Sequence, residues 1–353
     1  MEIVAINIGR YKTEVCICDI KDGTIHIEKE LIYGYESILD YIINCQDEKL
    51  SEFFVRIKDE LKLGEAPIYL SIPDSIVRID CRETTHEKPE FWKEKFKTAL
   101  MDSIPVLAEE PHCFDWAMVK PHPKNSELCF LTAVSVKRRY VATLDNALKV
   151  AKFNYQSFEP ASIAIARYLF DIVNPYLVLS VEHDRLTVSI SFGPIGIDLV
   201  GADFGWDVIL AGEFGIMKLL GILSPIDGRI RTRHLSNDEP PIYVFSEKAE
   251  EISEILQSKY EGRCLKINKC YPKIVTDIPA RKQSDIAIFA GLALKIIAER
   301  RNTQYEDNRV EATSKLQFNS IRGIRGKGVL ALEKICNRLP PFVRRVFGYR
   351  PHL

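Results

Sequence analysis

Two strand–turn–strand segments carry the residues with the clearest potential for chemistry. One runs from Val4 to Cys18 around the turn Asn7-Ile8-Gly9, and the other from Leu177 to Ser191 around Ser180-Val181-Glu182. A phosphate-binding turn needs glycine, which lets backbone N–H groups approach closely, and a carboxylate that holds Mg²⁺ and its waters. The first turn has glycine but an amide in place of the carboxylate. The second turn carries Glu182, whose charge would repel a nearby phosphate by about 4 kcal/mol at an effective dielectric near 20.

Other chemistries have little support in the sequence. The seven histidines never fall at i, i+3 or i, i+4 spacing, and no Gly-x-Ser-x-Gly or Walker-type loop occurs. The glycines between Gly193 and Gly205 fit tight turns better than a phosphate cradle, which would need them directly ahead of a helix. Nine scattered cysteines favour reduced thiols in a cytoplasm. We therefore expect no metal site and no catalytic residue.

Composition indicates a globular chain with one large or two medium cores. It has 353 residues, 46% of them hydrophobic, and a net charge of −1, which favours neither nucleic acid nor an acidic substrate. No apolar run approaches the ~20 residues needed to span a bilayer. Because Met1-Glu2 leads directly into an apolar strand, we expect no signal peptide.

The charge is concentrated at the C-terminal end. From Lys315 onward there are nine Lys or Arg residues and one acid, which leaves 39 basic and 48 acidic residues in the rest of the chain. Residues 321–328 are Gly-rich and predict a connector, and Val329 to Arg338 predicts a short helix before Pro340. Solvated disorder is the default interpretation of such a segment. Contact with a partner or an anionic membrane is the alternative, through Arg322, Arg325, Lys327, Lys334, Arg338, Arg344 and Arg345.

Strands and helices alternate along the body. The patterns predict one helix over Ile38 to Leu61, one over Lys137 to Lys152 and one over Trp206 to Gly221. They also predict a helix over Pro89 to Asp102 and a last body helix over Ser284 to Arg300. The predicted strands are 3–8, 14–19, 25–31, 67–72, 76–81, 114–119, 128–134, 154–158, 177–181, 186–191, 195–200 and 242–245.

Several of these segments together resemble the type IV pilus assembly protein PilM, which is itself similar to FtsA. The resemblance covers roughly Ile3 to Arg300, and each piece is short. The pieces, in order, are Gly64-Glu-Ala-Pro-Ile-Tyr-Leu-Ser-Ile-Pro-Asp74, Leu100-Met-Asp-Ser-Ile-Pro-Val-Leu-Ala-Glu-Glu110 with Phe114-Asp115, Phe130-Leu-Thr-Ala-Val-Ser-Val-Lys137, Phe158-Glu-Pro-Ala-Ser-Ile-Ala-Ile-Ala-Arg167 and Ile288-Phe-Ala-Gly-Leu-Ala-Leu-Lys295.

The resemblance implies an α/β fold: the actin-like, ribonuclease H-like duplicated, two-lobed fold with an FtsA/PilM-type inserted subdomain. It places the first lobe in residues 1–76 and 154–176 and the inserted subdomain in 77–153. The second lobe would be 177–314, followed by the basic tail, 315–353.

The same resemblance implies where a nucleotide would bind. The family has Asp-x-Gly at both turns and a Gly-Gly pair where this chain has Ser246-Glu247. Without these residues we expect no ATP hydrolysis and no cofactor, although ATP with Mg²⁺ remains open if the site is retained. The positions that match the family nucleotide motifs are Asn7, Gly9, Arg10, Lys12, Thr13, Ser180, Glu182, Ser246, Ala290 and Gly291.

The implied function is a cytoplasmic scaffold, peripheral at the inner membrane, of a type IV pilus, competence or secretion machine. Its partner would be the N-terminal cytoplasmic peptide of a PilN-like bitopic inner-membrane protein of the pilus assembly platform, with no nucleic acid involved. The resemblance places this peptide between the first lobe and the inserted subdomain, near Phe91 to Asp102 and Phe130 to Val136. Two alternatives stay open: an active actin-superfamily ATPase or small-molecule kinase, and the cytoplasmic domain of a type II secretion platform protein.

Overall fold

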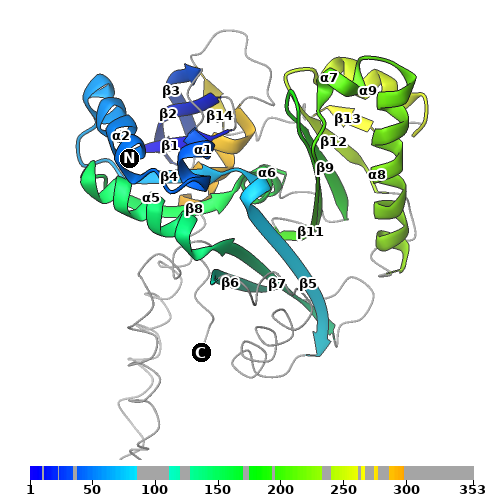
Figure 1. Ribbon diagram of the computed structural model, residues 1–353. Helices are drawn as coiled ribbons and strands as arrows, with labels where there is room; N and C mark the ends of the chain where they lie inside the picture. The colour runs from blue at the N-terminus through cyan, green and yellow to red at the C-terminus, as the bar shows by residue number, and fades with distance from the viewer. Residues whose placement is uncertain are drawn as a thin grey trace, which may run out of the picture.

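The chain forms three β-sheets with helices packed around the two larger ones (Figure 1). The computed structural model describes residues 1–9, 12–22, 24–34, 38–85, 111–119, 128–169, 175–192, 195–232, 240–260, 264–266, 274–276 and 286–297. The tail from Lys315 and the helix predicted over Pro89 to Asp102 lie outside these residues.

The first sheet has six strands and contains the first turn. In spatial order they are β14 (Ile274–Thr276), β3 (Thr24–Gly34), β2 (Lys12–Lys21), β1 (Glu2–Ile8), β4 (Ile68–Ile72) and β8 (Tyr155–Pro160). β1, β2 and β3 pair antiparallel as a meander, whereas β4, β8 and β14 join in parallel. Alternation along β1 sends Val4, Ile6 and Ile8 into one core cluster and Ile3 and Ala5 into another. Both faces of this sheet are therefore covered.

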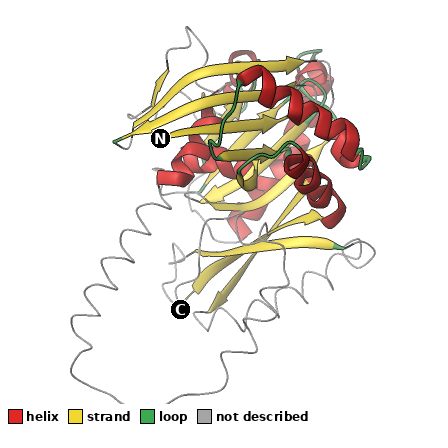
Figure 2. Cartoon of the chain, turned by 90° about the vertical axis from the view of Figure 1, so that its left-hand side faces the viewer, coloured by secondary structure: helices red, strands yellow, loops and turns green. Residues whose placement is uncertain are grey.

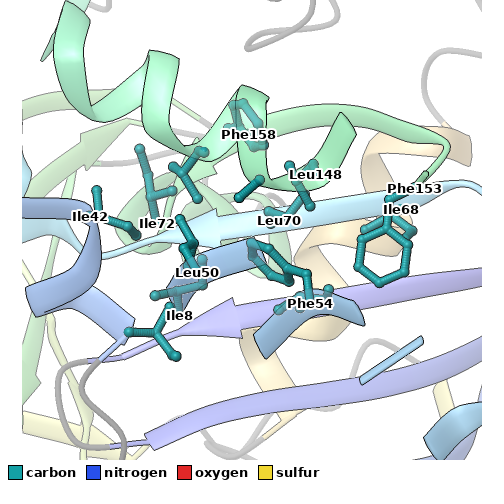
Figure 3. Close-up of a cluster of buried hydrophobic side chains, with 14 of the residues drawn as sticks. Ile8, Ile42, Leu50, Phe54, Ile68, Leu70, Ile72, Leu148, Phe153 and Phe158 are labelled. Carbon is teal, nitrogen blue, oxygen red and sulfur yellow. The ribbon is translucent and has the colours of Figure 1, made fainter. Parts of the chain in front are cut away.

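Helices α1 (Ile38–Ile43), α2 (Asp47–Leu61) and α5 (Arg138–Val150) cover the first of these faces. Their apolar sides bury Leu50, Phe54 and Leu148 against the sheet, and the rings of Phe54 and Phe153 meet edge to face at 5.9 Å (Figure 3). The single helix predicted over Ile38 to Leu61 is wrong at its centre. The chain turns at Cys45, whose φ is 53°, while backbone N–H groups of residues 44–46 close the end of α1.

The second sheet has five strands and contains the second turn. In spatial order they are β11 (Ile195–Ala202), β10 (Leu186–Phe192), β9 (Tyr176–Val181), β12 (Ile242–Phe245) and β13 (Cys264–Lys266). Helices α7 (Trp206–Ile209), α8 (Glu213–Thr232) and α9 (Ala249–Gln257) cover its outer face (Figure 1). The helix predicted over Trp206 to Gly221 is interrupted at Gly212, whose φ of 136° suits glycine alone.

Two buried helices join the two large sheets. Helix α6 (Ala161–Tyr168) contacts β4 and β8 on one side and β9, β10 and β11 on the other, and the helix over residues 286–297 packs in the same core cluster. Tyr176 on β9 donates its hydroxyl to the carbonyl oxygen of Ala166 at 3.1 Å. The cluster contains Ile3 and Ala5 from the first sheet together with Tyr176, Val178 and Tyr243 from the second. The two halves therefore share one apolar core.

The third sheet consists of β5 (Val77–Thr85), β7 (Leu128–Lys137) and β6 (His112–Val119), with β7 in the middle. Figure 2 shows it below the long strands of the first sheet. It falls within the predicted subdomain of residues 77–153, but α5 from that range packs in the core of the first sheet. Likewise β14, from the range 177–314, pairs with β3 at the edge of the first sheet. Residues from two of the predicted ranges thus contribute to the first sheet and its core. None of the described helices is long and apolar enough to cross a membrane.

Candidate functional site

The first turn is a tight hairpin in which glycine is required by the backbone itself. The Gly9 N–H donates to the carbonyl oxygen of Lys12 at 2.9 Å, and a Cβ on Gly9 would lie only 2.7 Å from that oxygen. Arg10, between these two residues, lies outside the described residues. The hairpin alone therefore accounts for Gly9, whether or not a phosphate ever binds there.

The polar side chains of this turn bind one another. The register of β1 on β2 places Asn7 opposite Glu14, and Asn7 Nδ2 donates to Glu14 Oε2 at 2.9 Å. Lys12 Nζ lies 2.8 Å from Glu14 Oε1, and the Glu14 side chain is buried. An aspartate in place of Asn7 would set two carboxylates against each other in this buried position. The amide of Asn7 is therefore compatible with the Glu14 carboxylate, whereas a second carboxylate would repel it.

Glu14 was not among the residues predicted from the sequence. Its signal was nonetheless present, because a short hairpin places residues at equal distances from the turn opposite each other. Thr13, the next residue back toward the turn, is also buried and pairs with Ile8.

The polar row continues across the first sheet. Ser71 on β4 is the register partner of Asn7, and Glu159 on β8 is the register partner of Ser71. Glu159 is fully buried and receives both guanidinium nitrogens of Arg167, at 2.5 and 3.0 Å. Lys295 Nζ lies 3.5 Å from the same carboxylate, and Arg167 also donates to the carbonyl oxygen of Gly291 at 3.0 Å. This ion network connects β8, α6 and the helix over residues 286–297.

A buried carboxylate, Asp74, follows β4 and meets the start of α6. It accepts hydrogen bonds from the Ser162 backbone N–H, 3.2 Å from each carboxylate oxygen, and from Ser162 Oγ at 2.8 Å. Burial raises the pKa of Asp74 to about 6, although the hydrogen bonds from Ser162 act in the opposite direction. Asp74 is therefore a group whose charge changes between mildly acidic and neutral pH.

This carboxyl predicts a pH dependence of stability. The unfolded chain loses the Asp74 proton near the ordinary pKa of 3.8, and the folded chain loses it only near 6. Stability therefore falls as the pH rises through that window, by up to about 3 kcal/mol. The Asp74→Asn variant keeps an acceptor oxygen for Ser162. We expect it to be more stable than the wild type by that order at about pH 7.5 and equal to it below about pH 4.

Urea unfolding at the two pH values measures this difference. Asp203→Asn is the matched control, because the Asp203 side chain is exposed, and it should change little at either pH. A stabilisation by Asp74→Asn that is the same at both pH values would contradict the assignment.

The start of α7 is hydrogen-bonded to the second turn. The Glu182 N–H closes the turn on the Arg185 carbonyl at 2.8 Å. The backbone N–H of Trp206 then donates to the Glu182 carbonyl at 2.9 Å, and that of Asp207 to the His183 carbonyl at 3.2 Å. A Cβ on Gly205 would lie 2.1 and 2.3 Å from those two carbonyl oxygens. The amide groups at the start of α7 are thus used by the chain itself.

Glu182 interacts electrostatically with groups from the other half of the molecule. The largest effect on its carboxyl is desolvation by the surrounding protein, which raises the pKa. The Asp74 carboxylate raises the pKa further, whereas Arg185 and Lys12 lower it. The side chain remains exposed to solvent, which weakens each of these effects. Asp74 and Lys12 come from the first half and Glu182 from the second. Charged groups from both halves therefore act on the Glu182 carboxyl.

The remaining predicted positions support packing. Ser246 is buried, donates its hydroxyl to the Val181 carbonyl at 2.7 Å and accepts from the Lys248 N–H at 3.1 Å, so it ties the start of α9 to β9. Ser180 pairs with Thr187 and Phe245 within the second sheet. Ala290 is buried, and a Cβ on Gly291 would lie 1.9 Å from the Ala164 carbonyl oxygen. These two small residues allow the helix over 286–297 to lie directly on α6.

The described residues contain no group of three or more His, Cys, Asp or Glu side chains that could hold a metal ion. Within that part of the chain, the carboxylates of the first turn and of β8 are each already paired with lysine or arginine. The arrangement can accordingly hold the two turns in fixed positions, with Glu14 and Glu159 each neutralised by a neighbouring cation.

The sequence matches no protein-family model and no curated protein. Among solved structures, a chain of the PilM–PilN type IV pilus biogenesis complex has a TM-score of 0.63 at 12% identity, over 84% of this chain and 98% of that one. The fold is actin-like.

Two further structures of this group have lower scores. The cytoplasmic domain of EpsL, an inner-membrane component of the type II secretion system of Vibrio cholerae, has a TM-score of 0.46 at 10% identity, over 82% of this chain and 94% of that one. A Bacteroides thetaiotaomicron protein with an actin-like ATPase fold and unknown function has a TM-score of 0.45 at 10% identity, over 83% and 95%. The similarity to the chain of the PilM–PilN complex confirms the actin-like fold expected from the sequence.

Proposed function

We propose that this protein is a PilM-like cytoplasmic scaffold of a type IV pilus, competence or secretion machine. It binds the N-terminal cytoplasmic peptide of a PilN-like inner-membrane protein and does not hydrolyse ATP. The similarity to a chain of the PilM–PilN type IV pilus biogenesis complex, over nearly all of that chain, supports the choice of machine. The charged and polar side chains of the two turns support a role without catalysis.

The observation that carries the proposal is that Glu14 is ion-paired with Lys12 and hydrogen-bonded by Asn7. A bound nucleotide would require Lys12 to leave a buried carboxylate, which would then lack its cation. Its phosphates would also face Glu182, with Asp74 adding further negative charge from the first half. Productive phosphoryl transfer needs a Mg²⁺ carboxylate and a positioned acid or base on these turns. Here the acids on both turns interact with cations of the chain itself.

The third sheet is the proposed region for the peptide. In the described part of the chain, β6 pairs on one side only, with β7, and β5 lies at the other edge. An extended peptide can add to such an edge through main-chain hydrogen bonds, with its alternate side chains in pockets. The predicted surface of Phe130 to Val136 lies on β7, whereas Phe91 to Asp102 lies outside the described residues.

A thermal-shift experiment with two ligands tests this function. We expect the N-terminal peptide of a PilN-like protein, at a hundredfold excess over its Kd, to stabilise the chain by about 2.7 kcal/mol. The melting temperature then rises by a few degrees, and Mg-ATP at millimolar concentration leaves it unchanged. A scrambled peptide of the same composition is the control. Hydrogen exchange in the presence of the peptide should slow in β5, β6 and β7.

Two results would overturn the proposal. The first is a rise in melting temperature with Mg-ATP accompanied by phosphate release, which would favour the ATPase alternative. The second is the absence of any difference between the PilN-like peptide and its scrambled control. The variant Lys12→Ala makes the Mg-ATP test more specific, because it removes the cation that an ATP-binding turn would use. Peptide binding should be unchanged in this variant.

A further inference from the structure

The corner between α7 and α8 exposes an unusual pair of apolar side chains. Phe214 is 72% exposed and Met217 is 66% exposed, the highest values among the large hydrophobic residues in the described part of the chain. They are three residues apart on α8 and so lie on the same side of the helix. A hollow of about 330 Å³ adjoins Phe214 and is lined by Asp207, Val208, Ala211, Gly212, Glu213, Phe214 and Gly215. We call Phe214, Met217 and this hollow the α7–α8 corner.

The backbone of the corner is fixed by close contacts. Gly212 has a φ of 136°, and a Cβ on Gly215 would lie 1.8 Å from the Val208 carbonyl oxygen. The first residues of α7 are in turn hydrogen-bonded to the second turn. Lys218 Nζ lies 4.7 Å from the centre of the Phe214 ring, which helps to hold that ring in its exposed position. A preformed surface of this kind loses little conformational freedom when it binds a ligand.

The hollow is acidic. Its lining includes the exposed carboxylates of Asp207 and Glu213 and no Lys or Arg. Both acids lie in the first turn of a helix, where a negative charge also stabilises the helix dipole. That local role does not explain why Phe214 and Met217 are exposed beside them. The corner therefore suits a ligand that combines positive charge with apolar side chains.

The chain itself contains such a ligand. Residues 315–353 hold nine Lys or Arg and one acid, and Phe342-Val-Arg-Arg-Val-Phe347 places two arginines between pairs of apolar residues. About 45 residues separate the last described helix from Phe342, and a coil of that length has a root-mean-square span of about 35–40 Å. That span is comparable to the size of a folded body of this length, whose radius of gyration is about 20 Å. The larger hollow between α2 and α5, of about 470 Å³, is lined by Arg56 as well as acids and is less selective for cations.

We propose that the basic C-terminal segment, residues 315–353, docks on the α7–α8 corner of the same molecule. Its apolar side chains cover Phe214 and Met217, and its arginines, Arg344 and Arg345 first, face Asp207 and Glu213. The segment thereby masks an exposed apolar surface of the second half and is itself held back from other partners.

Hydrogen–deuterium exchange on the full-length chain tests the docking. A tether of this kind gives an effective concentration of about 1 mM. A site with an affinity near 0.1 mM would then be occupied about nine-tenths of the time, which slows exchange about tenfold. The full-length variant R344E/R345E should lose that protection over residues 206–220. The variant D207K/E213K should lose it equally, and the combination of all four substitutions, which exchanges the charges, should restore it.

The control segment is α2, residues 47–61, which should exchange alike in all four proteins. Equal exchange of residues 206–220 in the wild type and R344E/R345E would overturn the proposal. So would a charge-exchanged protein that fails to recover protection, because the acids and arginines would then act independently. Protection that grows with protein concentration would place the contact between molecules instead. A tail that binds anionic vesicles while residues 206–220 are insensitive to R344E/R345E would place its site on the membrane.

Discussion

Replacing Arg167 by methionine should lower the free energy of unfolding by about 3–5 kcal/mol. Arg167 supplies two of the contacts to Glu159, which is fully buried on β8. Without the guanidinium, the carboxylate retains Lys295 at 3.5 Å, and the Gly291 carbonyl loses a donor. A buried charge with too little compensation is among the most destabilising changes in a protein. Urea unfolding at neutral pH measures the loss.

A second arginine provides the matched control. Arg185 pairs with Asp203 at 3.3 Å, but the Asp203 side chain is 90% exposed, so Arg185→Met should cost only about 0–1 kcal/mol. The double variant Glu159→Met with Arg167→Met removes both charges, and its loss should be smaller than that of Arg167→Met alone. If Arg167→Met and Arg185→Met prove equally mild, the network does not hold the core as described.

Replacing Gly291 by alanine should destabilise the protein by about 1–3 kcal/mol or more. Glycine to alanine inside a helix ordinarily stabilises by about 1 kcal/mol, because alanine has the higher helix propensity. Here the sign reverses, because the added Cβ would lie 1.9 Å from the carbonyl oxygen of Ala164. Helix α6 is buried on nearly every side and cannot move away. The measurement is again the urea midpoint, with the slope compared to detect any change in the native state.

Gly228, on α8, is the control for the ordinary sign. It is exposed and helical, and a Cβ there would meet nothing within 4 Å. Gly228→Ala should therefore stabilise by about 1 kcal/mol. A stabilising Gly291→Ala would contradict the close contact of the two helices. It would also reopen the interpretation of Ala290 and Gly291 as residues that border a ligand.

Local patterns of the sequence predicted most of the strands, because apolar alternation and turn residues are local signals. The strand over Ile242 to Phe245 is found with the predicted bounds. Breaks within helices were missed. Apolar periodicity continues through Cys45 and Gly212, so it does not reveal that the backbone turns there. The three-residue strand β14 was missed for another reason: its only support is pairing with β3, some 250 residues earlier.

Part of the candidate site could be proposed from the sequence. Asn7, Gly9 and Glu182 were identified from their residue types, because a turn that lacks its usual acid or gains an unexpected one is visible in sequence. The groups that explain them were not identified. Glu14 is connected to Asn7 by strand register, and Asp74 influences Glu182 across the space between the halves. The Glu159, Arg167 and Lys295 network joins residues far apart in the chain, which requires the tertiary structure to be known.

The position of β14 affects how this chain can fold during its synthesis. Strand β3 has its edge partner at residues 274–276, and one face of the first sheet is covered by the helix over residues 286–297. A ribosome must therefore translate most of the protein before its first sheet can be completed. Until then Ile25, Ile27 and the neighbouring cysteines of β2 lack part of the packing that buries them in the finished protein. The nascent chain therefore exposes apolar surface that a chaperone can bind.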